Sequence, residues 1–202
     1  MKLGIVSVAG LFLVLVLNLA GAADDQLKGS TYFPLKVGTK WHYRIGTTKL
    51  TLQVGKHEKV GDMTCALIES LKDGNIVATE HVAVKDDGVY RYSLAGQKPD
   101  MPFQILKLPP KKGDTWKVAV KIMNEELKGA FTSGEEEVTV PAGKYQAVTA
   151  TSTGFTSPDG EGNMQEVAFK FWFAPKVGQV KQTIKIGKRP EIAIELEKFE
   201  SP

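Results

Sequence analysis

The sequence is poor in the residues that form disulfides and metal sites. Its 202 residues include a single cysteine, Cys65. A lone cysteine excludes an intramolecular disulfide, and its position argues against a lipid anchor on a cysteine at the start of the mature chain. Period-two alternation places Cys65 on one strand face with Met63 and Leu67. We therefore expect a buried, unreactive thiol.

Catalytic and metal-binding motifs are also lacking. The three histidines, His42, His57 and His81, fall on three separate predicted strands and form no H-x-H or H-E-x-x-H arrangement. Two of them could meet across a sheet and bind a transition metal, but we favour positions on the surface or rim. The sequence has no Gly-x-Ser-x-Gly motif and no spacing typical of a Cys/His pair. We therefore predict that the protein is not an enzyme, and we assign no catalytic, cofactor-binding or metal-binding residue.

Neither sign of charge dominates the chain. The sequence has 26 Lys and Arg residues against 23 Asp and Glu residues. The lysines are scattered singly, whereas a nucleic-acid-binding protein normally has a clustered basic face. We therefore expect no nucleic-acid partner.

The one long hydrophobic run lies within the first 23 residues. Met1 and Lys2 precede the apolar run Leu3–Leu19, and the small residues Ala20–Ala23 follow it. This order predicts a cleavable signal peptide over residues 1–23. An uncleaved anchor is the alternative, but about 17 apolar residues are short for a membrane span. We expect an exported protein, periplasmic or extracellular, with no integral membrane span after cleavage.

The remaining chain is predicted to form a flexible segment over residues 24–31 and one all-β domain over residues 32–202. Apolar residues recur with period two rather than with helical spacing. The strongest hairpin signal is Asp73-Gly74, and further turns are expected at Asp86–Gly88 and Gly187–Pro190. We expect an antiparallel meander of about eleven strands, curled into a half-barrel or open β-barrel. The clearest alternating runs are 50–54, 116–122, 167–173, 180–186 and 192–196.

One segment of this domain, Ala95–Pro110, carries four prolines and cannot be a central strand throughout. A plain connector is the favoured interpretation. The alternative is a lid that crosses an open end of the sheet and contacts a ligand.

A short motif recurs before three of the predicted strands. Pro34–Trp41 (PLKVGTKW) is echoed by Pro109–Trp116 (PPKKGDTW) and, more weakly, by Pro175–Lys181 (PKVGQVK). Proline ends the preceding segment, and glycine permits a turn with positive φ. We predict that Trp41 and Trp116 are buried anchors where their strands begin, and that the repetition reflects a faint two-half symmetry.

The segments YFPLKVGTKWHY, VPAGKYQAV and FWFAPKVGQVKQT occur in this order. Together they resemble the TapB-like group, a family of exported bacterial proteins with a domain of unknown function, over about residues 32 to 199. The resemblance implies a cell-envelope protein with a curved antiparallel sheet, and it implies no activity. Lys181 departs from the pattern, because an aromatic residue is expected there by analogy with Trp41 and Trp116.

Two acidic segments could bind cations. Asp159, Glu161 and Asn163 imitate the first ligands of a calcium loop, but Lys170 occupies the position of the bidentate acid. The run Glu135–Glu137 could form a cation site or paired acids. We favour a charged stretch that keeps an edge strand soluble.

Aromatic residues are densest at Phe169, Phe171, Trp172 and Phe173, where hydrophobic core is the favoured interpretation and the wall of a ligand cavity the alternative. The predicted fold and export are compatible with two alternative functions. The first is a non-catalytic binding module for an apolar or lipid-like ligand held in a concave β-sheet. The second is a structural or protein-interaction domain of the envelope with a filled core and no small ligand. We assign no ligand-binding residue from the sequence, and we expect no cofactor.

Overall fold

The computed structural model describes residues 29–122, 125–158 and 161–202. The predicted signal peptide, residues 1–23, lies outside this range, as do residues 24–28. The described residues contain no helix with the length and hydropathy of a membrane span. The strands are β1 (Gly29–Ser30), β2 (Phe33–Pro34), β3 (Lys40–Ile45), β4 (Thr48–Val60), β5 (Met63–Lys72), β6 (Asn75–Lys85), β7 (Gly88–Ser93), β8 (Phe103–Lys107), β9 (Thr115–Ile122), β10 (Glu125–Val140), β11 (Gly143–Thr153), β12 (Thr156–Pro158), β13 (Met164–Ala174), β14 (Gly178–Ile186) and β15 (Ile192–Glu200).

The predicted all-β antiparallel fold is confirmed. Thirteen strands form one sheet in the order β8-β7-β6-β5-β4-β3-β15-β14-β13-β11-β10-β9, with β12 beside β13. The strands outnumber the predicted eleven because β1, β2, β8 and β12 are short and lack a long alternating pattern. Gly29 and Ser30, expected in a flexible segment, pair with Pro34 and Phe33.

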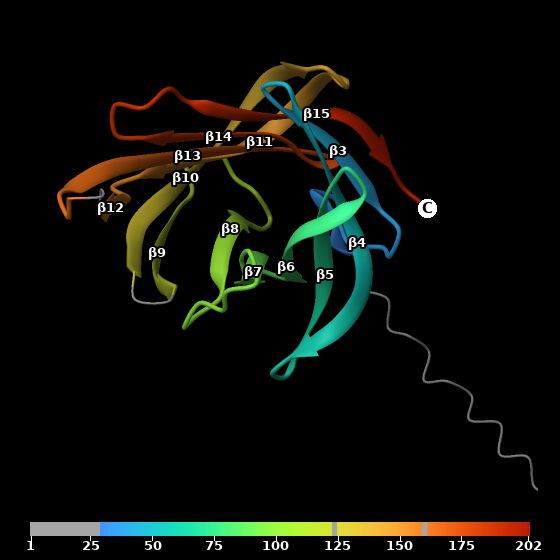
Figure 1. Cartoon of the computed structure of the whole chain (residues 1–202), viewed down its shortest axis with the longest axis horizontal. Coiled ribbons are helices and arrows are strands. Elements are labelled where there is room, and N and C mark those ends of the chain that lie inside the picture. The colour runs from blue at the N-terminus through green and yellow to red at the C-terminus, as the bar shows by residue number, and fades with distance from the viewer. Residues whose placement is uncertain (1–28, 123–124, 159–160) are drawn as a thin grey trace, which may run out of the picture.

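Two meanders make up the sheet, and they meet where the first and last long strands pair. Strands β3 to β8 follow one another in space, and so do β9 to β15 apart from β12. Since β15 pairs with β3, the sheet ends at β8 and β9, which are consecutive in the chain. Figure 1 shows the sheet curled so that these two edges face each other across a seam. The Trp116 indole nitrogen of β9 donates to the Gln104 carbonyl of β8 at 3.1 Å across that seam.

The two ends of the barrel differ in how they are filled. Because all neighbouring strands are antiparallel, the segment before β3 and the connections β4–β5, β8–β9 and β13–β14 lie at one end, which we call the plugged end. The opposite end carries the connections β3–β4, β5–β6, β7–β8 and β14–β15, and we call it the cavity end. Buried aromatic and aliphatic side chains fill the plugged end, among them Phe33, Leu35, Trp41, Trp116 and Phe173.

The first two copies of the recurring motif form the same turn, and the third copy shares only the glycine with positive φ. Gly38, Gly113 and Gly178 have φ values of 90°, 86° and 93°. The Gly38 amide donates to the Val54 carbonyl at 2.8 Å, and the Gly113 amide donates to the Ser133 carbonyl at the same distance. The first two turns each open one of the two meanders, which accounts for the two-half pattern of the sequence.

We expect Gly113→Ala to lower the free energy of unfolding by about 1–2 kcal/mol, because an L-residue is strained at this φ. An added Cβ at Gly113 would meet no atom within 4 Å, so the loss would report backbone strain alone and not a steric clash. Urea denaturation measures the loss. The exposed neighbour Lys112 provides the control: Lys112→Ala should change stability by less than about 0.5 kcal/mol. Equal midpoints for the two variants would contradict the turn assignment.

Candidate functional site

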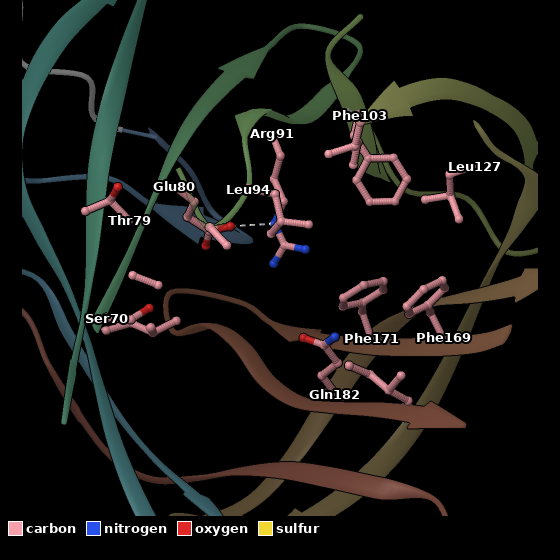
Figure 2. Close-up of a pocket in the computed structure, with 15 residues that line it drawn as sticks. Ser70, Thr79, Glu80, Arg91, Leu94, Phe103, Leu127, Phe169, Phe171 and Gln182 are labelled. Atoms are coloured by element: carbon pink, nitrogen blue, oxygen red, sulfur yellow. Dashed lines mark ion pairs between the residues drawn. The ribbon is translucent and has the colours of Figure 1, made fainter. Parts of the chain in front are cut away.

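A cavity of about 290 Å³ occupies the barrel interior toward the cavity end. Both meanders line it. Most of the lining residues lie in the connection after β7 or in the half of their strand that is nearer the cavity end. Ser70, Thr79, Glu80 and Arg91 form a polar wall on the side of β5, β6 and β7, and aromatic side chains line the opposite, largely apolar wall, where Gln182 lies beside Phe171 (Figure 2). The polar lining residues are Ser70, Thr79, Glu80, Arg91 and Gln182, and the apolar ones include Leu52, Phe103, Ile122, Leu127, Phe169, Phe171 and Ile184.

An ion pair dominates the polar wall. The Arg91 Nε atom of β7 lies 2.8 Å from the Glu80 Oε2 atom of β6, and the two side chains are only 12% and 11% exposed. The guanidinium also lies over the Phe171 ring, 5.7 Å from its centroid. Behind the pair, the Tyr43 hydroxyl donates to the Gln179 carbonyl at 2.6 Å. Burial, and after it the Glu80 carboxylate, raises the pKa of Tyr43 far above its ordinary value, so this phenol stays neutral.

The aromatic run of β13 divides between the two faces of the sheet, as its alternation predicts. Phe171 and Phe173 are buried inside, and Phe169 and Phe171 both line the cavity. Both sequence-based interpretations of this run therefore describe part of it: one portion is core, and another is cavity wall. Trp172 lies on the outer face yet is only 6% exposed. The ammonium groups of Lys170 and Lys181 cover its ring, at 4.7 Å and 5.6 Å from the centroid.

Lys181 is therefore an outward residue of β14, where it also pairs with Glu195 at 3.1 Å. The third copy of the motif keeps the glycine with positive φ, at Gly178, but has no inward aromatic anchor. Its Val177 carbonyl instead accepts a hydrogen bond from the Trp41 indole nitrogen at 2.6 Å.

The proline-rich segment Ala95–Pro110 combines a connector and an edge strand. Its central part is β8, which pairs with β7 on one side only. Ala95, at the start of the segment, lines the cavity together with Leu94. Pro99 forms an isolated bridge with Ile122 of β9, so the connector spans the seam beside the cavity.

The structure does not bring the three histidines together. His42 contacts Thr51 and lies 3.4 Å from a Glu200 oxygen, while His57 lies 2.7 Å from the Leu35 carbonyl. In the parts of the chain that the structure describes, no group of three or more His, Cys, Asp or Glu side chains is arranged to hold a metal ion. The third histidine, His81, lies between Glu58 and Ser93, 2.7 Å from an oxygen of each.

The acidic segments and the cysteine have other surroundings. Glu136 pairs with Lys170, and Glu137 pairs with Lys144, each at 2.8 Å. The part of β10 that contains Glu135–Glu137 pairs with β11 but not with β9, so one of its edges is unpaired. Charged side chains on such an edge are consistent with a role in protecting it. The segment 159–163, whose likeness to a calcium loop the sequence did not favour, falls partly on residues 159 and 160, outside the described residues. Cys65 is fully buried, and burial raises the pKa of its thiol to about 11.

Sequence reasoning missed the cavity's polar pair, Glu80 and Arg91. A signal for both exists in the strand pattern. Glu80 stands two residues before the buried Val82, and Arg91 stands two residues after the buried Val89. A charge at an inward position of an alternating strand implies either a buried partner or a cavity.

Comparison with known proteins supports this architecture. No family model and no curated protein matches the chain. A crystal structure described as a candidate lipoprotein from Parabacteroides distasonis matches at 14% identity with a TM-score of 0.56, covering 85% of this chain and 99% of that one. A candidate exported protein with a YmcC-like fold from Bacteroides fragilis matches at 13% identity with a TM-score of 0.57, covering 85% of this chain and 100% of that one. These similarities establish a shared fold, and the TapB-like resemblance stays a hypothesis.

Proposed function

We propose that this protein is an exported, non-catalytic binding module of the bacterial envelope that holds an apolar or lipid-like ligand. The cavity is the observation that carries the proposal. Its volume of about 290 Å³ lies close to the lower bound for small-molecule sites, which is about 300 Å³. Most of its lining side chains are apolar, and only a few polar groups face it, as in typical ligand pockets.

Exposed apolar side chains at the cavity end support the same proposal. Of the large hydrophobic residues exposed in the described part of the chain, all except Val37 lie in or beside connections at that end. Apolar groups gathered near a cavity ease the passage of a ligand that is poorly soluble in water. These residues are Ile76, Val77, Leu94, Met101, Met164 and Ile192.

Export rests on the predicted signal peptide over residues 1–23. The two matching structures support it, because one is described as a candidate exported protein and the other as a candidate lipoprotein. The cavity lies wholly within the domain that would remain after cleavage.

Solvent extraction of natively purified protein, followed by mass spectrometry, tests the proposal. We expect a recurrent lipid-like species at close to one molecule per chain. A clean extract, together with no displacement of an environment-sensitive dye by single-chain lipids, would favour the alternative of a structural or protein-interaction domain.

A cavity-filling variant sharpens this test. Ala78 lines the cavity, so Ala78→Phe should weaken dye binding by roughly tenfold or more, equivalent to about 1.4 kcal/mol. Ala119 faces outward from β9 and is exposed, so Ala119→Phe is the matched control and should bind like the parent. Equal dye affinity for both variants would place the dye site elsewhere on the protein and count against the cavity.

A further inference from the structure

The polar wall of the cavity is specific enough to indicate which head group a ligand carries. The side chains of Glu80 and Arg91 are only 11% and 12% exposed, and they face the cavity from adjacent strands. The two atoms that form the ion pair, Arg91 Nε and Glu80 Oε2, are buried, and neither makes a hydrogen bond within the described part of the chain. Figure 2 shows the terminal nitrogens of Arg91 projecting toward the middle of the cavity, between the polar and aromatic walls.

Among the described residues, no hydrogen bond joins those terminal nitrogens to an acceptor. A guanidinium has five N–H groups in a planar fork, and one edge of the Arg91 fork faces Glu80. Buried polar groups normally have hydrogen-bond partners. The remaining donors are therefore suited to an oxygen acceptor that enters the cavity. On the other side of the pair, Glu80 can accept a hydrogen bond from a ligand hydroxyl or amide.

The opposite charges of Glu80 and Arg91 cancel, and a neutral pair favours a ligand without net charge. A carboxylate that approached Arg91 would be attracted by the guanidinium and repelled by the Glu80 carboxylate a few ångströms beyond it. It would also lose its hydration in a largely apolar cavity, which is costly for an ion. A neutral head group keeps the hydrogen bonds and avoids both penalties.

The volume limits what else can enter. Water occupies about 30 Å³ per molecule in the liquid, so the cavity of about 290 Å³ has room for on the order of ten non-hydrogen atoms. That is a single chain of medium length, or the buried portion of a longer one. A complete two-chain lipid exceeds it.

We propose that the Glu80–Arg91 pair recognises the uncharged, oxygen-bearing head of a single-chain lipid, such as a monoacylglycerol, in preference to a free fatty acid. This inference rests on the proposed binding function and adds the chemistry of the head group. The apolar chain would lie against Phe103, Leu127 and Phe169 on the opposite wall.

Titration of the delipidated protein with 1-decanoylglycerol and with decanoate at neutral pH tests the proposal. The parent should bind 1-decanoylglycerol at least about tenfold more tightly than decanoate. In Glu80→Gln, which leaves the charge of Arg91 uncompensated, this order should reverse. Glu195→Gln is the matched control, because Glu195 lies on β15 outside the cavity lining and its loss should leave the order unchanged.

The outcomes separate the two proposals. If neither lipid binds the parent, both proposals fail. If both lipids bind equally or decanoate binds more tightly, or if Glu80→Gln leaves the ratio of affinities unchanged, the binding function stands and the head-group assignment is overturned. Should Glu80→Gln fail to fold, Glu80→Leu/Arg91→Met replaces it, since it removes both charges at once. This double variant should bind the two lipids without preference for either head group, and retained preference would overturn the assignment.

Discussion

Replacing Trp41 with alanine is expected to lower the free energy of unfolding by about 3–5 kcal/mol, the usual cost of removing a buried Trp side chain. Trp41 is 2% exposed and lies between Phe33 and Phe199, with ring centroids 5.9 Å and 6.0 Å away. The substitution would leave a cavity at the plugged end. It would also remove the donor to the Val177 carbonyl.

Trp116→Ala should fall in the same range, because Trp116 stacks on Phe131 at 5.5 Å and is 8% exposed. Denaturant melts monitored by circular dichroism measure both losses. Met164→Ala is the control at a 63% exposed apolar residue, and it should change stability by less than about 0.5 kcal/mol. If the melts of the two Trp variants coincide with that of the parent, the two side chains do not stabilise the plugged end. Because the Trp116 indole spans the seam, its loss should accelerate amide exchange in β8 and β9 more than in the other strands, whereas Trp41→Ala should not single out these two strands.

The second large effect concerns the ion pair in the cavity. Single substitutions in this pair should lower the free energy of unfolding much more than the double substitution does. Glu80→Leu leaves the Arg91 charge without its partner, and Arg91→Met does the same to Glu80. Each should cost about 3 kcal/mol, because an uncompensated charge in a largely buried site is expensive. The double variant should lose far less than either single variant, since it replaces both charges with apolar groups.

A double-mutant cycle from urea melts at pH 7 gives the coupling energy between the two residues. Additive losses would show that the pair is not coupled in the folded protein. If the double variant is as stable as the parent, the pair contributes little net stability. Its charges would then be explained better by what the cavity binds than by what holds the barrel together.

The strands that the sequence predicted well are those with one face buried along their whole length. In β9, Trp116, Val118 and Val120 are buried while Lys117 and Ala119 are exposed. Period-two patterning reports this arrangement directly. The Asp73-Gly74 turn was also predictable, because its φ values of 51° and 79° are those that an Asp-Gly hairpin adopts.

Other elements escaped prediction for identifiable reasons. Strand β8 is flanked by Pro102 and Pro109, which are compatible with an edge but conceal a strand in the sequence. In β10, Gly129 interrupts the alternation because the Phe155 ring occupies the space where a Cβ would stand. The pairing of β3 with β15 depends on how the whole sheet curls, and no local pattern encodes it.

The candidate site was harder to predict than the fold. The sequence pattern placed Phe169 and Phe171 on the inward face of their strand. Whether such side chains pack against other residues or line a cavity depends on the residues that face them across the barrel. The opposite wall comes from the other meander, more than 70 residues away in the chain, and includes Arg91. Single-strand patterns carry no information on this juxtaposition.

The pairing of β3 with β15 joins segments that are far apart in the chain, and from this we expect an order of events during folding. Tyr43 and Leu196 are opposite each other in this pair, and closing a loop of roughly 150 residues carries a larger entropic cost than forming a hairpin. The local hairpins can therefore form before the two meanders join. The cavity takes side chains from both meanders, so it exists only once the last strand has docked. A ligand held there would bind the closed barrel alone and would shift the folding equilibrium toward it by mass action.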